Sequence, residues 1–217
     1  MSKNNAGYMG QQIGKLGPAV GRRWRGMNVY SAYQKFVRDR KSESQLAVRA
    51  KFGAITSLSR CLRSATRMGL AGIKTLWDGN NAFVHLNWPA VSGATAQEVA
   101  ISYADIIVSR GNLPSVSFGA ADFEEELTVK VPITENNIDV PGTSASDLVY
   151  LIVYQPDLKQ GILGTPVLRS SESISVTVPS AWSGMRAYVW GFCIGAPSNA
   201  IPNEPSDSYY VGTGTIG

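Results

Sequence analysis

The spacing of the hydrophobic positions changes along the chain, and the change separates a helical part from a strand-rich part. Between residues 42 and 68, apolar residues recur with the 3.6-residue period of an amphipathic helix. Ser42 and Gln45 fit a capping box at the start of this helix. A shorter helix is expected over 80–88, because Pro89 disfavours helical geometry in the residue before it.

From residue 115 onward, short apolar or alternating runs are separated by Pro, Gly, Asn and Ser turn signals. About seven short strands with such turns predict an antiparallel β-sandwich of the immunoglobulin or fibronectin kind. The strands are expected at 115–118, 126–132, 148–154, 166–169, 173–178, 185–194 and 207–211.

These patterns together predict an α+β protein of three parts. Residues 1–41 form a glycine-rich basic arm, residues 42–114 a helical and extended connecting region, and residues 115–217 the β-sandwich domain. The second boundary is placed at Pro114, where the apolar period changes from 3.6 to 2. Within the arm, residues 20–30 have strand character and predict either a short hairpin or an arm that orders against a partner.

The composition is typical of a folded chain with a core. Hydrophobic residues make up 44% and charged residues 17% of the 217 residues, which excludes wholesale disorder. No apolar run approaches the length of a membrane span, and residues 1–18 contain no secretory signal, so we expect no membrane partner. Cys61 and Cys193 lie in unlike contexts and are expected to be free thiols, which favours a cytoplasmic compartment.

The charge is divided unevenly between the two ends of the chain. Residues 1–78 hold 15 of the 20 Lys and Arg and 3 acids, a net charge of +12. Residues 79–217 hold the other 5 basic residues and 13 acids, a net charge of −8. A basic half of this size attracts polyanions, whereas oppositely charged halves on one chain suit head-to-tail assembly.

Two groups of residues carry the basic charge in a pattern that indicates an interface. Three arginines flank a tryptophan in the arm, and four arginines fall within about 60° of one another on the long helix. Their partner is either acidic protein surface, including the next copy of the chain, or the phosphates of a nucleic acid. The predicted interface residues are Arg22, Arg23, Trp24, Arg25, Arg49, Arg60, Arg63 and Arg67.

No catalytic, cofactor-binding or metal-binding constellation emerges from the sequence. His85 is the single histidine, and no Gly-x-Ser-x-Gly motif occurs. Residues 10–16 differ from a phosphate loop in spacing and have Leu16 where Ser or Thr is required. The acidic residues within 122–126 are expected to face solvent, and a cation-binding site there is the alternative interpretation. We therefore expect a protein that is not an enzyme.

Several short motifs in a fixed order resemble an uncharacterised family of Bacteroidota proteins and of their phages, including crAss-like phages. The resemblance covers almost the whole chain and implies no catalytic residues. In phages it implies a structural component of the particle, a ring around the portal and tail. The segments that carry it are 17–18, 20–29, 44–45, 50–52, 107–114, 153–154, 178–184 and 208–212.

The charge pattern and the resemblance lead to one expected function. The protein is expected to be a non-enzymatic structural virion protein that forms a homo-oligomeric ring in the portal–tail (neck or collar) assembly. Its partners would be itself and other phage structural proteins, such as the portal or adjoining ring proteins, in a virion assembled in the bacterial host cytoplasm. The alternatives are a nucleic-acid-binding protein acting through the basic half, and a bacterial interaction or adhesion module.

Overall fold

A computed structural model describes residues 2–4, 13–36, 39–73, 79–123, 126–197 and 203–217. The chain forms two compact units, which meet in the sequence between Lys41 and Ser42. Residues 1–41 are called the N-terminal unit, and residues 42–217 the main unit. Each unit contains its own antiparallel sheets.

The N-terminal unit is a four-stranded antiparallel sheet with the strand order β1-β4-β3-β2. A hairpin joins its two longest strands, and both loop residues, Arg25 and Gly26, have positive φ (47° and 77°), as a type I′ turn requires. Of the two alternatives predicted for residues 20–30, a short hairpin or an arm that orders against a partner, the structure has the short hairpin. Strands, rather than an irregular arm, occupy most of the described glycine-rich segment, because ladder pairing satisfies its backbone groups. The bounds are β1 Ser2–Asn4, β2 Gly14–Leu16, β3 Ala19–Trp24 and β4 Met27–Ala32.

The main unit begins with three α-helices: α1 Glu43–Cys61, α2 Arg63–Gly69 and α3 Gly79–Asn87. The single helix predicted over 42–68 is thus divided at Leu62, where the backbone (φ −94°, ψ 10°) departs from helical geometry. Ser42 stands at the N-cap with extended backbone, but its side chain makes no capping hydrogen bond. The position of the predicted cap is right, and the predicted capping box is not formed.

Ten antiparallel strands follow the helices in the described part of the main unit. They form a five-stranded sheet of order β10-β9-β13-β14 with β11 paired to β9, a three-stranded sheet β12-β8-β7, and the pair β5-β6. The bounds are β5 Val91–Ser92, β6 Ala100–Ile101, β7 Ser117–Phe118, β8 Thr128–Glu135, β9 Leu148–Gln155, β10 Gln160–Leu163, β11 Val167–Leu168, β12 Ser173–Thr177, β13 Arg186–Ile194 and β14 Tyr209–Thr215.

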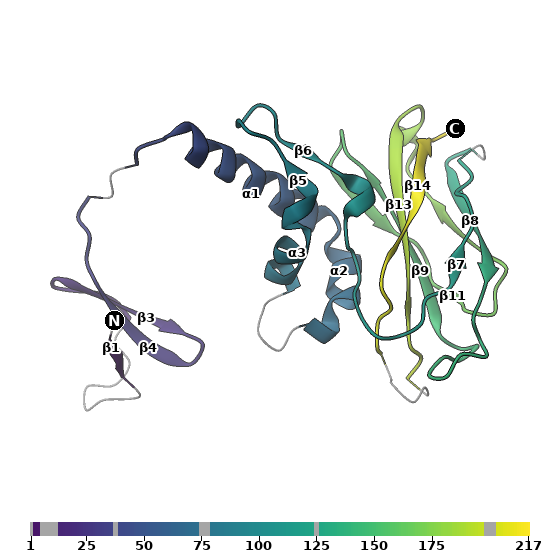
Figure 1. The fold of residues 1–217 in the computed structure, drawn as a ribbon, viewed down its shortest axis with the longest axis horizontal. Helices are drawn as coiled ribbons and strands as arrows, with labels where there is room; N and C mark the ends of the chain where they lie inside the picture. The colour runs from purple at the N-terminus through teal and green to yellow at the C-terminus, as the bar shows by residue number, and fades with distance from the viewer. Residues whose placement is uncertain (1, 5–12, 37–38, 74–78, 124–125, 198–202) are drawn as a thin grey trace. The chain divides into compact units, whose positions relative to one another are not determined.

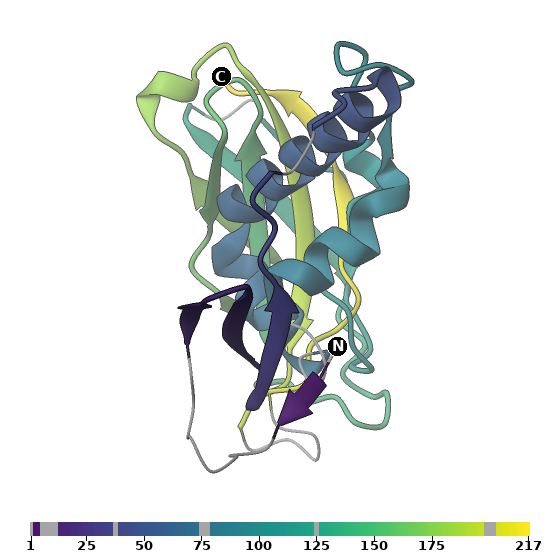
Figure 2. The same cartoon turned by 90° about the vertical axis from the view of Figure 1, so that its left-hand side faces the viewer.

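The main unit has three layers, with the five-stranded sheet in the middle (Figure 1). The helices cover one face of this sheet and lie in front of it in the turned view (Figure 2). The three-stranded sheet covers the opposite face. Strands β9 and β13 are therefore buried on both sides: Val149, Leu151, Val153, Ala187 and Val189 face the second sheet, whereas Ile152, Tyr154, Trp190 and Phe192 face the helices.

The predicted boundary at Pro114 lies inside the main unit. The core beneath the helices joins Leu58 and Phe83 to the sheet residues Ile152 and Trp190, so residues on both sides of 114 share one apolar cluster. The change of hydrophobic period at this point marks a change of secondary structure and not the edge of a compact unit. The protein combines α-helices with antiparallel sheets, in agreement with the predicted mixture.

Candidate functional site

The N-terminal hairpin places the predicted residues Arg22, Arg23, Trp24 and Arg25 on two faces and a turn. Arg22 pairs with Val29 and Trp24 with Met27, so Arg22 and Trp24 share one face of the sheet, and Arg23 lies on the other. Arg25 lies in the turn, with its guanidinium carbon 5.0 Å from the centre of the Trp24 ring. This cation–π contact holds a positive charge beside an exposed aromatic surface.

Large apolar side chains of the N-terminal unit are exposed. Trp24 is 53% exposed, Ile13 71% and Phe36 93%. Of residues 13–36, which the structure describes, the buried ones are Gly21, Asn28 and Val29. The unit therefore presents aromatic and basic side chains together, a composition that is enriched in protein interfaces.

Three of the four predicted helix-face arginines come together in the main unit. Arg60, Arg63 and Arg67 line one hollow of about 540 Å³, which we call the arginine hollow. Arg49 does not line it, because it lies three helical turns before Arg60 on α1. Arg60 belongs to the last turn of α1, and Arg63 and Arg67 belong to α2, so the hollow spans the break at Leu62. Among the described residues, the lining comprises Thr56, Ser59, Arg60, Arg63, Thr66, Arg67, Gly79 and Asn80.

The arginine hollow lies where the start of α3 meets the side of α1 and α2. The Ser59 hydroxyl donates a hydrogen bond to Asn80 Oδ1, which fixes the first turn of α3 against α1. The Thr56 hydroxyl oxygen is buried and has no hydrogen-bond partner among the described residues. Sequence reasoning missed Thr56, although it precedes Arg60 by four residues and therefore shares its face of the helix.

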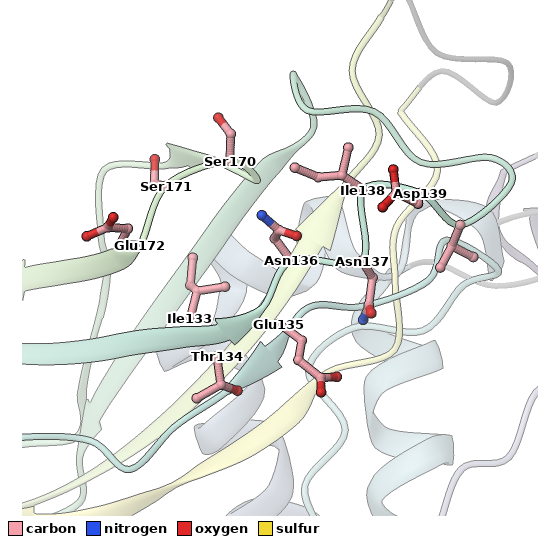
Figure 3. A pocket seen from close by; sticks show the side chains of 11 residues that line it. Ile133, Thr134, Glu135, Asn136, Asn137, Ile138, Asp139, Ser170, Ser171 and Glu172 are labelled. Atoms are coloured by element: carbon pink, nitrogen blue, oxygen red, sulfur yellow. The ribbon is translucent and has the colours of Figure 1, made fainter.

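A second hollow of about 460 Å³ lies among the loops that follow β8 and precede β12 (Figure 3). Its carboxylates Glu135, Asp139 and Glu172 lie apart from one another in Figure 3. Among the residues that the structure describes, no group of three His, Cys, Asp or Glu side chains could hold a metal ion. Of the acidic run 122–126, Asp122 joins Lys130 in an antiparallel bridge, and residues 124–125 lie outside the described residues.

The match to a protein family covers both units. Residues 10–212 match the model of a family of unknown function, DUF6266. The chain belongs to the DUF6266 family. An uncharacterised family is what the ordered motifs predicted. No curated protein matches the chain.

In this DUF6266 protein, the motif of residues 109–114 holds the helices to the C-terminal segment. The Ser109 hydroxyl lies 3.1 Å from the carbonyl oxygen of Gly69 and 2.6 Å from that of Ser206. Gly111 is packed so closely against Pro205 that a Cβ atom would overlap the Pro205 carbonyl. Close packing and hydrogen bonding therefore account for the serine at position 109 and the glycine at position 111.

Two tryptophans and a cysteine are buried in the core of the main unit. Trp182 and Trp190 are fully buried, and the Trp182 indole donates a hydrogen bond to Gln160 Oε1 over 3.1 Å. Cys61 and Cys193 are free thiols, as predicted, and burial raises the pKa of each. Trp77 lies outside the described residues. None of the described helices is long and apolar enough to cross a membrane.

A fully buried ion pair in the DUF6266 chain escaped the sequence analysis. Arg169 Nε lies 3.2 Å from Asp147 Oδ2, and neither side chain is exposed. The Arg169 guanidinium also donates to the carbonyls of Asn136 (3.0 Å) and Pro114 (2.6 Å). The pair therefore joins loops from distant parts of the chain and serves the structure of the main unit.

Tyrosines gather where the helical layer meets the central sheet. The rings of Tyr103 and Tyr188 have centroids 4.2 Å apart, and those of Tyr103 and Tyr154 have centroids 5.8 Å apart. Burial is the main cause that raises the pKa of Tyr103 and of Tyr154 above the ordinary tyrosine value. These hydroxyls stay protonated at neutral pH and contribute to packing rather than to the charge of the surface.

Proposed function

We propose that this protein is a non-enzymatic structural protein of a phage particle, which associates with itself into a closed ring in the portal–tail assembly. Its further partners would be the portal or an adjoining ring protein, and its place would be the virion, assembled in the host cytoplasm. The motifs that resemble proteins of Bacteroidota and of their crAss-like phages support the phage assignment.

The exposure of the N-terminal unit is the observation that carries this proposal. A sheet is stable when at least one of its faces is buried against another element, and very small sheets are marginal on their own. In the described part of this unit few residues are buried, and Ile13, Trp24 and Phe36 are exposed. We infer that a neighbouring subunit covers these side chains in the assembly.

The distribution of charge supports a head-to-tail arrangement of subunits. The basic residues of the hairpin and of α1 and α2 belong to the +12 part of the chain, and the sandwich belongs to the −8 part. A contact between the basic part of one copy and the acidic part of the next is heterologous. Such contacts produce a ring when the rotation between copies closes.

We further infer that the two packed sheets are an immunoglobulin-like or fibronectin-like module. The strand order supports this relation: β7, β8 and β12 form one sheet, and β10, β9, β13 and β14 form the other. In chain order this arrangement corresponds to strands A, B and E opposite strands C′, C, F and G. A rigid module of this kind would form the body of each ring subunit.

The mass of the native assembly tests the ring. Sedimentation velocity of the full chain is expected to give a single discrete oligomer at low salt and smaller species as the salt concentration rises. The variant R22E/R23E/R25E should lower this mass at moderate salt and leave the fold intact. Single exposed ion pairs contribute only about 0–1 kcal/mol, so several charges are reversed together.

A matched variant controls for net charge. K130E/K159E/R186E reverses three exposed charges of the sandwich and changes the net charge by the same amount. It should assemble like the original chain. A monomer at every concentration would refute the proposal. A different result would favour the alternative function. If both triple variants assemble normally and only R22E/R23E/R25E loses salt-dependent DNA binding, the basic residues serve nucleic-acid binding and the ring proposal is wrong.

A further inference from the structure

One face of the N-terminal sheet carries both positive charge and an exposed tryptophan. Lys15 pairs with Val20, and side chains two residues apart on a strand share a face, so Lys15, Arg22 and Trp24 lie on the same side of the sheet. All three residues are exposed, so no described element covers this side, which we call the basic face.

Cations already lie against the aromatic rings at the basic face. Lys15 Nζ is 4.1 Å from the centre of the Tyr33 ring, and Arg25 contacts the Trp24 ring. A single-stranded nucleic acid binds by stacking successive bases on aromatic rings. Rings with a cation across them are less open to bases, and they present positive charge beside apolar surface. The basic face therefore fits an acidic surface that also carries apolar side chains.

The main unit has a surface of this composition among the loops that follow β8 and precede β12. The hollow of about 460 Å³ at this place, which we call the loop hollow, is lined by the exposed residues Glu135, Asp139 and Glu172 and by no described Lys or Arg. Val140 also lines it and is 39% exposed. A hollow of this size can receive an aromatic ring, because pockets for small molecules begin at about 300 Å³.

The negative charge of the loop hollow is not balanced by the arginine that precedes it in the sequence. Arg169 is buried and pairs with Asp147 over 3.2 Å, so its charge is already matched. Glu135, Asp139 and Glu172 lie apart from one another in Figure 3 and do not converge on one metal ion. Carboxylates spread around a hollow can each meet a different cation of a broad basic surface.

We propose that the loop hollow of a second copy of this chain docks onto the basic face, with Trp24 over the hollow and the charges of Lys15 and Arg22 against its carboxylates. This inference rests on the proposed self-association and names the two surfaces that meet in it. Opposite charges on the two surfaces select the partner and fix the register of the contact. A tryptophan with charged residues around it is a typical anchor of an interface. Because the two surfaces differ, each copy offers one surface to each neighbour, and the contact repeats from copy to copy.

Charge reversal on each surface, and on both together, tests this contact. In sedimentation velocity at low salt, D139K/E172K should raise the midpoint concentration of assembly about tenfold, because two attractions become repulsions. K15E/R22E should have a similar effect. The chain with all four substitutions should regain the original midpoint to within about threefold, since the reversed surfaces again attract each other. Such a rescue requires that the two surfaces face each other.

E98K/E126K is the matched control for D139K/E172K. It reverses two exposed carboxylates of the main unit that do not line the loop hollow, and it changes the net charge by the same amount. Its midpoint of assembly should equal that of the original chain. Circular dichroism should show the same secondary structure in all of these variants.

Three results would overturn the contact. If D139K/E172K and E98K/E126K shift the midpoint equally, or if the fourfold variant assembles no better than the two double variants, the loop hollow is not the partner of the basic face. The ring proposal nevertheless survives if R22E/R23E/R25E still lowers the mass of the assembly. If K15E/R22E assembles normally but loses salt-dependent binding of a thymidine oligonucleotide, the basic face serves nucleic acid instead. A chain that is monomeric at every concentration overturns this contact and the ring together.

Discussion

Replacing Trp24 by alanine should weaken self-association more than any single arginine substitution. The Trp24 side chain is 53% exposed, and a tryptophan offers up to roughly 250 Å² of surface. Covering the exposed part at an interface would therefore remove roughly 130 Å² from water. At about 25 cal/mol per Å², this burial is worth about 3 kcal/mol for each contact, or more than a hundredfold in association constant.

The concentration at which the oligomer forms is the quantity to measure. Sedimentation velocity over a series of protein concentrations should show that Trp24→Ala shifts the midpoint of assembly upward by about two orders of magnitude. Circular dichroism should show an intact main unit, because Trp24 belongs to the N-terminal unit. The substitution also removes the ring that the Arg25 guanidinium contacts, which adds up to about 1 kcal/mol.

Tyr209→Ala serves as the matched control for Trp24→Ala. Tyr209 is an aromatic residue of strand β14 with a similar exposure of 55%. Its replacement should leave the midpoint of assembly unchanged. Equal shifts for the two variants, or none for Trp24→Ala, would refute the role of the hairpin as an apolar anchor.

Two further outcomes follow from buried polar groups. Asp147→Asn leaves the buried Arg169 charge without its carboxylate partner. It should lower the free energy of unfolding, measured in urea, by about 3–5 kcal/mol. As a control, Asp139→Asn replaces an exposed carboxylate and should change this free energy by less than about 0.5 kcal/mol. Burial raises the pKa of Tyr103 and Tyr154 above 10.0 in the folded state, so these groups ionise first in the unfolded chain as pH rises. The stability that depends on these neutral hydroxyls should therefore be fully present below about pH 9 and decrease above pH 10. The midpoint of urea unfolding should be lower at pH 10.5 than at pH 8, and an unchanged midpoint would contradict this prediction.

Most strands follow from the sequence because local apolar runs decide them. The runs at 148–154 and 185–194 correspond closely to β9 and β13. Strand β10 does not follow from the sequence pattern, because glycines such as Gly161 and Gly164 are typical of turns. In the structure, Gly161 lets β10 pack directly against the carbonyl of Cys61 at the end of α1, a close approach that a side chain would block.

The sequence predicts the arginines of the arginine hollow but not its other wall, because helical periodicity reports only on residues close together in the sequence. The period places Arg60, Arg63 and Arg67 on one face, and in the structure the three line one hollow although the helix is divided at Leu62. It cannot show that the start of α3 meets this face, since that contact depends on the tertiary packing. The same limit applies to the Asp147–Arg169 pair, whose residues have no shared periodic pattern and meet only when the main unit folds.

The three-layer arrangement has a consequence for the order of events during synthesis. Helices α1–α3 leave the ribosome well before β9 and β13, the strands on which they pack. At 5–20 residues per second, the interval between residues 87 and 194 lasts about 5–20 s. During this time the apolar side of the helices has no sheet to cover it. Nascent chains should therefore be prone to premature association, and slower-growing, cooler cultures or added chaperones should raise the yield of correctly folded protein.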